Sequence, residues 1–155
     1  MEELNSNVAF NNVPIGIFIE QAEMLLDQVN GKQSISERID EIRIASDGLF
    51  IAKEEDKVIA CASLLYPIWD QAGIILHFAV DAKYRRKGIG RELFGQVQLF
   101  SENYGLKKLV VQTALHSQSS IDFWKSLGFT INFQGLYEYM GEGSVLIWLD
   151  KNVDS

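Results

Sequence analysis

The residues with the clearest potential for chemistry form a basic segment at positions 83–91, between an apolar run and a helical pattern. Five of the chain's 14 Lys and Arg residues fall within it: Lys83, Arg85, Arg86, Lys87 and Arg91. Gly88 and Gly90 leave out the Cβ atoms that would keep a ligand away from the main chain. A strand, a loop and a helix start in this order gather backbone N–H groups at the positive end of a helix dipole. The segment therefore predicts a phosphate-binding site, and the alternative is a solvated turn before a helix.

The loop differs from the two most common nucleotide-binding motifs. A Walker loop ends in Gly-Lys-Ser/Thr, whereas here Gly90 is followed by Arg91 and Glu92. A dinucleotide-binding fingerprint requires Gly or Ala at the position of Leu93, and its strand opens the domain. Both motifs are therefore excluded.

Hydrophobic periodicity predicts the elements that position the loop. The predicted strands are 49–53, 58–66, 74–80, 109–113, 129–133 and 145–149. One helix follows Gly88 and ends at Gly105, and a second covers about 119–127 with Ser119 or Ser120 as its cap. This order of elements indicates a mixed sheet with helices packed on it rather than an alternating doubly wound fold.

Residues 1–30 carry the least clear pattern, and two interpretations of them stay open. Residues 15–19 fit a short strand followed by a helix over 20–29, but Pro14 can equally open one longer helix. Residues 34–37 form a Ser-x-x-Glu capping box, and isoleucines at helical spacing follow it. A helix is therefore expected to begin at Ser34.

Composition favours a single domain spanning residues 1–155, since 47% hydrophobic residues supply a sizeable core. The net charge of −7 argues against a nucleic-acid-binding protein, because duplex binding needs a broad basic face. Cys61 is the only cysteine, which excludes an intrachain disulfide, and the N-terminus lacks the pattern of a signal peptide. No apolar run approaches the roughly 20 residues that cross a bilayer. We expect a cytoplasmic protein without a membrane segment or a metal ion.

Two motifs resemble those of one known family. The pattern Arg85-x-x-Gly88-x-Gly90 after a strand resembles the acetyl-coenzyme A signature of the GNAT superfamily of N-acetyltransferases. Residues 123–129, Phe-Trp-Lys-Ser-Leu-Gly-Phe, are similar to the family's Phe-Tyr-x-x-x-Gly-Phe, and residues 116–118 look like the short Ala-Gln segment of some members. With the order of elements, the resemblance covers about residues 35–149.

The resemblance implies an α+β fold with a mixed, mostly antiparallel sheet of about seven strands, flanked by about four helices. Two central parallel strands are expected to splay apart and to admit acetyl-coenzyme A (acetyl-CoA) between them. Backbone N–H groups of residues 86–91 would bind its pyrophosphate, and the Val80 amide would point at the thioester carbonyl. The implied coenzyme-binding residues are Phe78, Ala79, Val80, Arg85, Arg86, Lys87, Gly88, Ile89, Gly90, Arg91, Ser117 and Trp124.

The implied reaction is direct attack of a primary amine on the acetyl thioester in a ternary complex. Many members place a Tyr hydroxyl near the sulfur as general acid, but this chain has Trp124, whose indole is not a practical acid at neutral pH. A general acid contributes roughly 10²- to 10⁴-fold, so its loss slows the reaction without abolishing it. Trp124 fits equally well as a core residue that packs its helix onto the sheet.

Few residues are candidates for a general acid or a general base. His77, on the strand before the loop, is a candidate general base because imidazole titrates near neutral pH, and His116 is a second candidate. Tyr137 is a candidate catalytic residue that would replace the missing acid, together with Tyr66 and Tyr139 near the expected acceptor groove. Each of these residues also fits a purely structural role.

Three functions remain open at this stage. The first is an N-acetyltransferase acting on an amine of a small molecule or peptide, and the second is a non-catalytic acyl-CoA-binding or sensing domain. The third is a structural phosphate-binding module unrelated to coenzyme A. The sequence does not specify the acceptor. Aromatic residues near the C-terminus are compatible with a homodimer.

Overall fold

The fold was analysed in a computed structural model. It describes residues 8–13, 25, 49–66, 71–114, 117–137 and 144–154. The elements expected between residues 14 and 48 lie outside the described residues, apart from Leu25, which is helical and buried. The described strands and helices cover the whole region that contains the two motifs.

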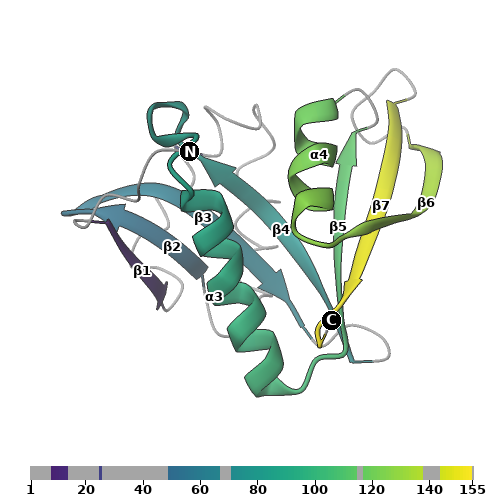
Figure 1. The fold of residues 1–155 in the computed structure, drawn as a ribbon, viewed down its shortest axis with the longest axis horizontal. Helices are drawn as coiled ribbons and strands as arrows, with labels where there is room; N and C mark the ends of the chain where they lie inside the picture. Colours follow the sequence, from purple (N-terminus) through teal and green to yellow (C-terminus); the bar gives the residue numbers. More distant parts are fainter. Residues whose placement is uncertain are drawn as a thin grey trace.

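In the described part of the chain, seven strands form one sheet in the order β1-β2-β3-β4-β5-β7-β6 (Figure 1). Their bounds are β1 Val8–Val13, β2 Leu49–Glu54, β3 Lys57–Leu65, β4 Ala72–Val80, β5 Lys108–Ala114, β6 Thr130–Tyr137 and β7 Ser144–Asn152. Every neighbouring pair is antiparallel except β4 and β5, which run parallel. The predicted mixed, mostly antiparallel sheet is confirmed.

Strand β1 is the one described strand that the sequence did not predict. It pairs with β2 at one edge of the sheet, with Val8 opposite Glu54 and Val13 opposite Leu49. Its sequence, Val-Ala-Phe-Asn-Asn-Val, has two central asparagines, which are depleted in strands. Cross-strand pairing with β2 therefore overrides a weak local preference.

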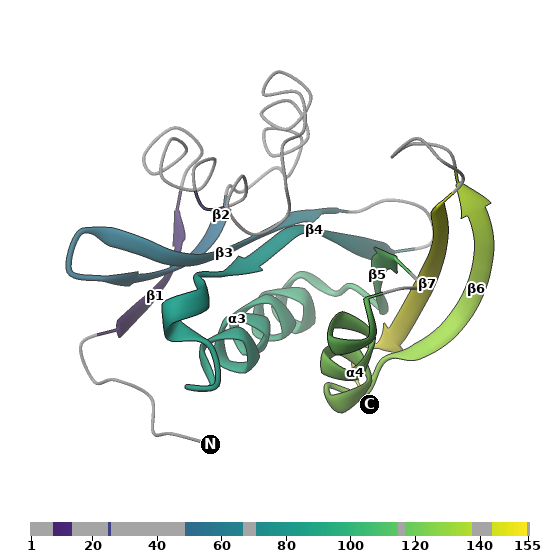
Figure 2. The same cartoon turned by 90° about the horizontal axis from the view of Figure 1, so that it is seen from above.

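Two α-helices and one short 3₁₀ helix are described, and both α-helices cover the same face of the sheet (Figure 2). Helix α3 spans Ile89–Tyr104 and α4 spans Gln118–Ser126, while the 3₁₀ helix η1 spans Ala82–Tyr84. Gly105, in a left-handed conformation with φ of 95°, ends α3 as the sequence predicted. The predicted starting point of α4 is wrong, because Ser117 stands at its N-cap position. The Ser120 hydroxyl instead accepts a hydrogen bond from Thr113 of β5 at 3.0 Å.

The sheet opens between its two parallel strands. Strands β4 and β5 are paired at only three positions, from Ala72 opposite Lys108 to Ile74 opposite Val110. Beyond these positions β4 pairs only with β3 and β5 only with β7, and the two strands diverge toward their C-terminal ends (Figure 1). The splay predicted for the central strands is therefore present. The described pairing between β4 and β5 therefore ends at Ile74 and Val110.

Candidate functional site

The basic loop lies where β4 has separated from β5, and it leads directly into α3 (Figure 1). The Asp81 carboxylate begins it by accepting a hydrogen bond from the Lys83 N–H at 3.0 Å. Arg86 and Gly88 then both take left-handed conformations, with φ of 64° and 81°. Such a conformation costs a non-glycine residue about 1–2 kcal/mol, so Arg86 is strained. Strain of this kind is concentrated at functional sites. Turns that contain left-handed residues direct the N–H groups of successive residues toward one point.

The first turn of α3 adds further donors at the same place. Glu92 donates its N–H to the Gly88 carbonyl at 3.0 Å, which makes it the first residue with an α-helical partner. The preceding N–H groups, of Ile89, Gly90 and Arg91, lie in the turn that has no carbonyl four residues earlier within the helix. These amides sit at the positive end of the α3 dipole, which favours an anion.

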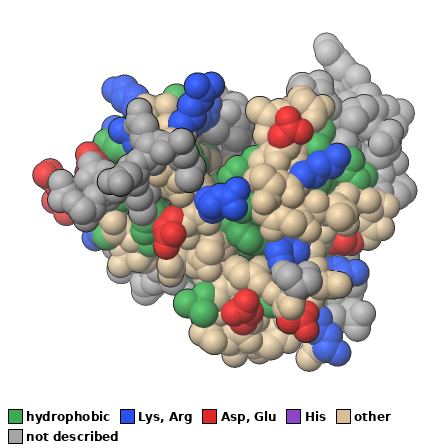
Figure 3. Space-filling model, viewed as in Figure 1, with side chains coloured by type: hydrophobic (Ala, Val, Ile, Leu, Met, Phe, Trp, Pro, Cys, Tyr) green, Lys and Arg blue, Asp and Glu red, His purple; other side chains and the backbone are tan. Residues whose placement is uncertain are grey.

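The loop also carries most of the local positive charge. Figure 3 shows Lys and Arg side chains gathered at the end of the molecule where the loop between β4 and α3 lies in Figure 1. Arg85 turns back and donates from Nε to the Val80 carbonyl at 3.4 Å, which holds the loop against the end of β4. A chain with a net charge of −7 thus presents a positive surface beside the amides of residues 86–91.

Gly90 lies where the two helices pack closely. A Cβ atom at Gly90 would lie 3.3 Å from the Phe123 ring and 3.5 Å from Val80 Cγ2. Arg91 donates to the Ser126 hydroxyl at 3.2 Å, and Ser126 donates to the Phe123 carbonyl at 2.6 Å. Helix α4 is thereby fixed against the first turn of α3 and the end of β4.

A β-bulge shapes β4 just before the loop. Cys61 pairs with Ala79 and Ser63 with Leu76, so that two residues of β4 oppose the single residue between them on β3. His77, inside the bulge, has a φ of 54°. The fully buried Ser63 and Cys61 stabilise the bulge by donating to the carbonyls of Leu76 at 3.0 Å and His77 at 3.6 Å.

The orientation of Val80 follows from its neighbour. The Asp81 N–H donates to the Ile59 carbonyl of β3 at 2.8 Å. Backbone groups alternate in direction along a strand, so the N–H and C=O of Val80 face the other edge, where β5 has moved away. The Val80 N–H is therefore directed into the opening between β4 and β5.

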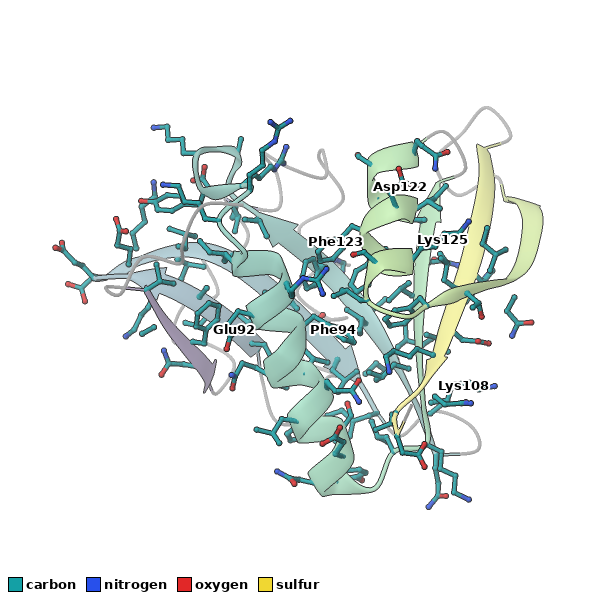
Figure 4. All side chains as sticks on the ribbon, viewed as in Figure 1. Glu92, Phe94, Lys108, Asp122, Phe123 and Lys125 are labelled. Atoms are coloured by element: carbon teal, nitrogen blue, oxygen red, sulfur yellow. The ribbon has the colours of Figure 1, made fainter. Side chains whose placement is uncertain are left out.

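Trp124 lies at the centre of a cluster of aromatic rings that joins α3, α4 and the sheet. It is 5% exposed. The centroid of its ring lies 4.9 Å from that of Phe78 and 5.3 Å from that of Phe129, both in edge-to-face geometry. Figure 4 shows Phe94 of α3 and Phe123 of α4 lying between the two helices, and both rings also contact Trp124. This environment is that of a packing residue, which was the alternative interpretation of Trp124.

The remaining candidates are placed as follows. Ser117 is partly buried at the start of α4, and its side chain makes no capping hydrogen bond. Tyr66 is buried against Phe100 and Tyr104 in the C-terminal half of α3, at the end of that helix far from the loop, so it does not border the opening. His116 and Tyr139 lie outside the described residues, as does the side chain of Tyr137. The predicted roles of His77, Ser117 and Tyr137 stay predictions.

Sequence reasoning did not find the contacts of Tyr84, which lies inside the loop. Its hydroxyl donates to Glu54 Oε1 at 3.0 Å, across 30 positions of sequence. This hydrogen bond, followed by burial and by the negative charges of Glu54 and Asp81, raises the pKa of Tyr84 above its ordinary value of 10.0. Its position in the basic loop was the only available signal.

The raised pKa of Tyr84 makes stability depend on pH in the alkaline range. The folded protein holds the phenol proton more tightly than the unfolded chain, whose Tyr pKa is about 10. This contribution is complete below about pH 10 and is lost as the pH rises through the higher folded pKa. We expect the melting temperature of the wild type to fall relative to that of Tyr84→Phe as the pH rises above about 10. A difference between the two proteins that stays constant across this range would contradict the assignment.

The described residues hold no group of three or more His, Cys, Asp and Glu side chains that is arranged to bind a metal ion. Among the same residues, no helix is long and apolar enough to cross a membrane.

Comparison with known sequences identifies the family. The sequence model of the Acetyltransferase (GNAT) family matches residues 19–129, well over half of the chain. The chain belongs to the GNAT family. The loop, the first turn of α3 and the whole of the second motif lie within the matched residues.

Curated relatives of this GNAT protein match it over part of their length. An amino-acid acetyltransferase of Azotobacter vinelandii is 36% identical over 99 residues, which are 63% of this chain and 19% of that protein. Amino-acid acetyltransferases of Pseudomonas aeruginosa are 42% identical over 64 residues, or 41% of this chain and 15% of those proteins. The chain thus matches about a fifth or less of the length of these relatives.

Solved structures agree with the fold along nearly the whole chain. The ribosomal-protein-S18-alanine N-acetyltransferase of Escherichia coli superposes with a TM-score of 0.80 at 18% identity, covering 94% of both chains. A GNAT family acetyltransferase of Elizabethkingia anophelis, solved with acetyl-CoA bound, gives a TM-score of 0.76 at 26% identity, covering 96% of this chain and 99% of that one.

Proposed function

We propose that this GNAT protein transfers the acetyl group of acetyl-CoA to a primary amine of a small molecule or peptide. The observation that carries the proposal is the loop at residues 86–91, whose left-handed Arg86 and Gly88 lead into the free amides of the α3 N-terminus. The loop lies at the end of β4, beside the opening in the sheet. Membership of the GNAT family and the acetyl-CoA-bound Elizabethkingia structure support the choice of coenzyme.

Acetyl-CoA would lie along the loop, the start of α3 and the end of β4. Its pyrophosphate would accept hydrogen bonds from the amides of residues 86–91, with Arg85 and Lys87 adding positive charge. The amide groups of the pantetheine arm would pair with the open edge of β4 near Phe78 and Val80, as an added strand does. The acetyl group would then lie beside the Val80 N–H, which faces the opening.

The reaction requires polarisation of the thioester carbonyl and removal of a proton from the amine. As the amine nitrogen attacks the thioester carbon, negative charge develops on the carbonyl oxygen, and the Val80 N–H would stabilise it by donating a hydrogen bond. The tetrahedral intermediate then breaks its C–S bond and releases the thiolate. His77, on the same strand, is the proposed acceptor of the proton that the amine loses, directly or through water.

The leaving thiolate needs little assistance. The aromatic surroundings of Trp124 give its indole a packing role, and indole does not release a proton at neutral pH. A thiol has a pKa of about 8.5, so the thiolate is a tolerable leaving group that can take its proton from water. Correct placement of the two substrates would supply much of the acceleration. Tyr137 remains a proposed alternative acid.

A non-catalytic acyl-CoA-binding domain is the second candidate function. The observation that favours it is the burial of Trp124 among phenylalanine rings, where many members of the family have a general acid. Both functions require the same phosphate loop, so only turnover distinguishes them. The cytoplasmic location and the homodimer suggested by the sequence stay predictions.

Acetyl transfer can be tested by following release of free coenzyme A thiol from acetyl-CoA with a panel of amines. The names of similar proteins guide the panel, which should hold free amino acids and peptides with N-terminal alanine. We expect thiol release that depends on one class of amine and yields a product heavier by one acetyl group. Tight coenzyme binding without turnover on any amine would instead support the second function.

A further inference from the structure

We propose that the tip of the β2–β3 hairpin is a positioning element for the phosphate loop, and that Glu54 acts on coenzyme affinity through Tyr84. The proposal rests on the proposed function, because it concerns the loop that would bind coenzyme A. Glu54 is the last residue of β2 and Tyr84 the last residue of η1, two positions before the strained Arg86. The hydrogen bond between them joins the hairpin to the loop.

Two lysine side chains also lie near the Tyr84 ring. Lys57, the first residue of β3, places Nζ 5.9 Å from the ring centroid, and Lys87 of the loop places Nζ 5.7 Å from it. Both distances lie within the range of cation–π attraction. Lys57 also forms an ion pair with Asp81 at 3.6 Å, and Asp81 caps η1. Hairpin and loop are thus joined by a connected polar network rather than by one contact.

This arrangement bears on affinity because the loop carries its own strain. Arg86 must keep its left-handed conformation for the amides to face the ligand, and the relaxed alternatives of the loop would scatter them. A loop that is already ordered loses less conformational freedom when the ligand binds. The hairpin therefore raises affinity without touching the coenzyme, and the rate of the chemical step does not depend on it.

The direction of the change in coenzyme affinity distinguishes the positioning role of Glu54 from an effect of its negative charge alone. Glu54 is negative and lies near an anion-binding loop, so removing its charge would by itself tighten coenzyme binding. Loss of the hydrogen bond to Tyr84 would loosen it. Glu55, the next residue, is exposed and lies in the turn of the same hairpin, so Glu55→Ala removes an equal charge while leaving Tyr84 untouched. It is the matched control.

The test measures the dissociation constant of coenzyme A by calorimetry for the wild type, Glu54→Ala, Tyr84→Phe, the double variant and Glu55→Ala. Hydrogen bonds to charged groups contribute enough for us to expect roughly threefold to tenfold weaker binding in Glu54→Ala and Tyr84→Phe. The double variant should bind no more weakly than either single variant, because each substitution removes the same hydrogen bond. Glu55→Ala should bind as the wild type does or slightly more tightly. The turnover number at saturating acetyl-CoA should be unchanged in all of them.

A second measurement needs no ligand. Amide hydrogen exchange at residues 82–91 should be faster in Glu54→Ala than in Glu55→Ala, while exchange in the core of α3 stays the same. Wild-type affinity and exchange in Glu54→Ala, or additive losses in the double variant, would overturn the positioning role alone. Absence of coenzyme binding by the folded wild type would overturn the proposed function together with it.

Discussion

Gly88→Glu is expected to lower the affinity for coenzyme A at least about a hundredfold while the protein still folds. The substitution places a carboxylate among amides that are directed at a phosphate, and like charges at that distance repel strongly. Gly88 also has a φ of 81°, so any side chain costs the loop about 1–2 kcal/mol and favours a different conformation. The charge repulsion and the backbone strain both weaken binding. Calorimetric titration with coenzyme A measures their combined effect on the dissociation constant.

Gly105→Glu is the matched control for Gly88→Glu. Gly105 ends the same helix with a φ of 95°, and a Cβ there would meet nothing within 4 Å. The variant carries the same charge and a similar backbone strain at the far end of α3. We expect it to lose about 1 kcal/mol of stability and to bind coenzyme A normally. Equal affinity in Gly88→Glu and the wild type would remove the loop from the binding site.

Trp124→Ala is expected to lower the free energy of unfolding by about 3–5 kcal/mol, which is the usual cost of deleting a buried aromatic side chain. The indole is 5% exposed and contacts rings from β4, α3, α4 and the start of β6. Its removal would leave a cavity between the two helices and the sheet, and urea unfolding measures the loss.

Leu99→Ala is the control for Trp124→Ala, since Leu99 lies on α3 but is 51% exposed. Its unfolding free energy should change by no more than about 0.5 kcal/mol. A loss below about 1 kcal/mol in Trp124→Ala would mean that the indole is not packed as described. Trp124 would then again be a candidate for direct contact with the coenzyme.

The elements that the sequence predicted best are those with local signals. The limits of α3 at Gly88 and Gly105 follow from glycines next to a helical pattern, and the two residues flank the helix in the structure. Strands β2 and β3 agree with the two apolar runs predicted at 49–53 and 58–66, and they pair as neighbours. The opening between β4 and β5 came from the family resemblance, because no local pattern encodes where two strands separate.

Features that depend on distant contacts were not predicted. β1 is held by pairing with β2, and the hydrogen bond from Tyr84 to Glu54 joins segments 30 residues apart. The choice between Ser117 and Ser120 at the start of α4 depends on Thr113, a residue of β5. The burial of Trp124 likewise reflects rings from four elements, which the sequence around it does not reveal.

The most direct test of the account is a calorimetric titration of the folded protein with coenzyme A, paired with its melting temperature at a hundredfold excess over the dissociation constant. Binding by the loop at residues 86–91 predicts saturable heat at one site per chain. It also predicts a rise in melting temperature, since such an excess stabilises the folded state by about 2.7 kcal/mol. Absence of both binding heat and a thermal shift would contradict the central claim that these backbone amides hold the coenzyme's pyrophosphate.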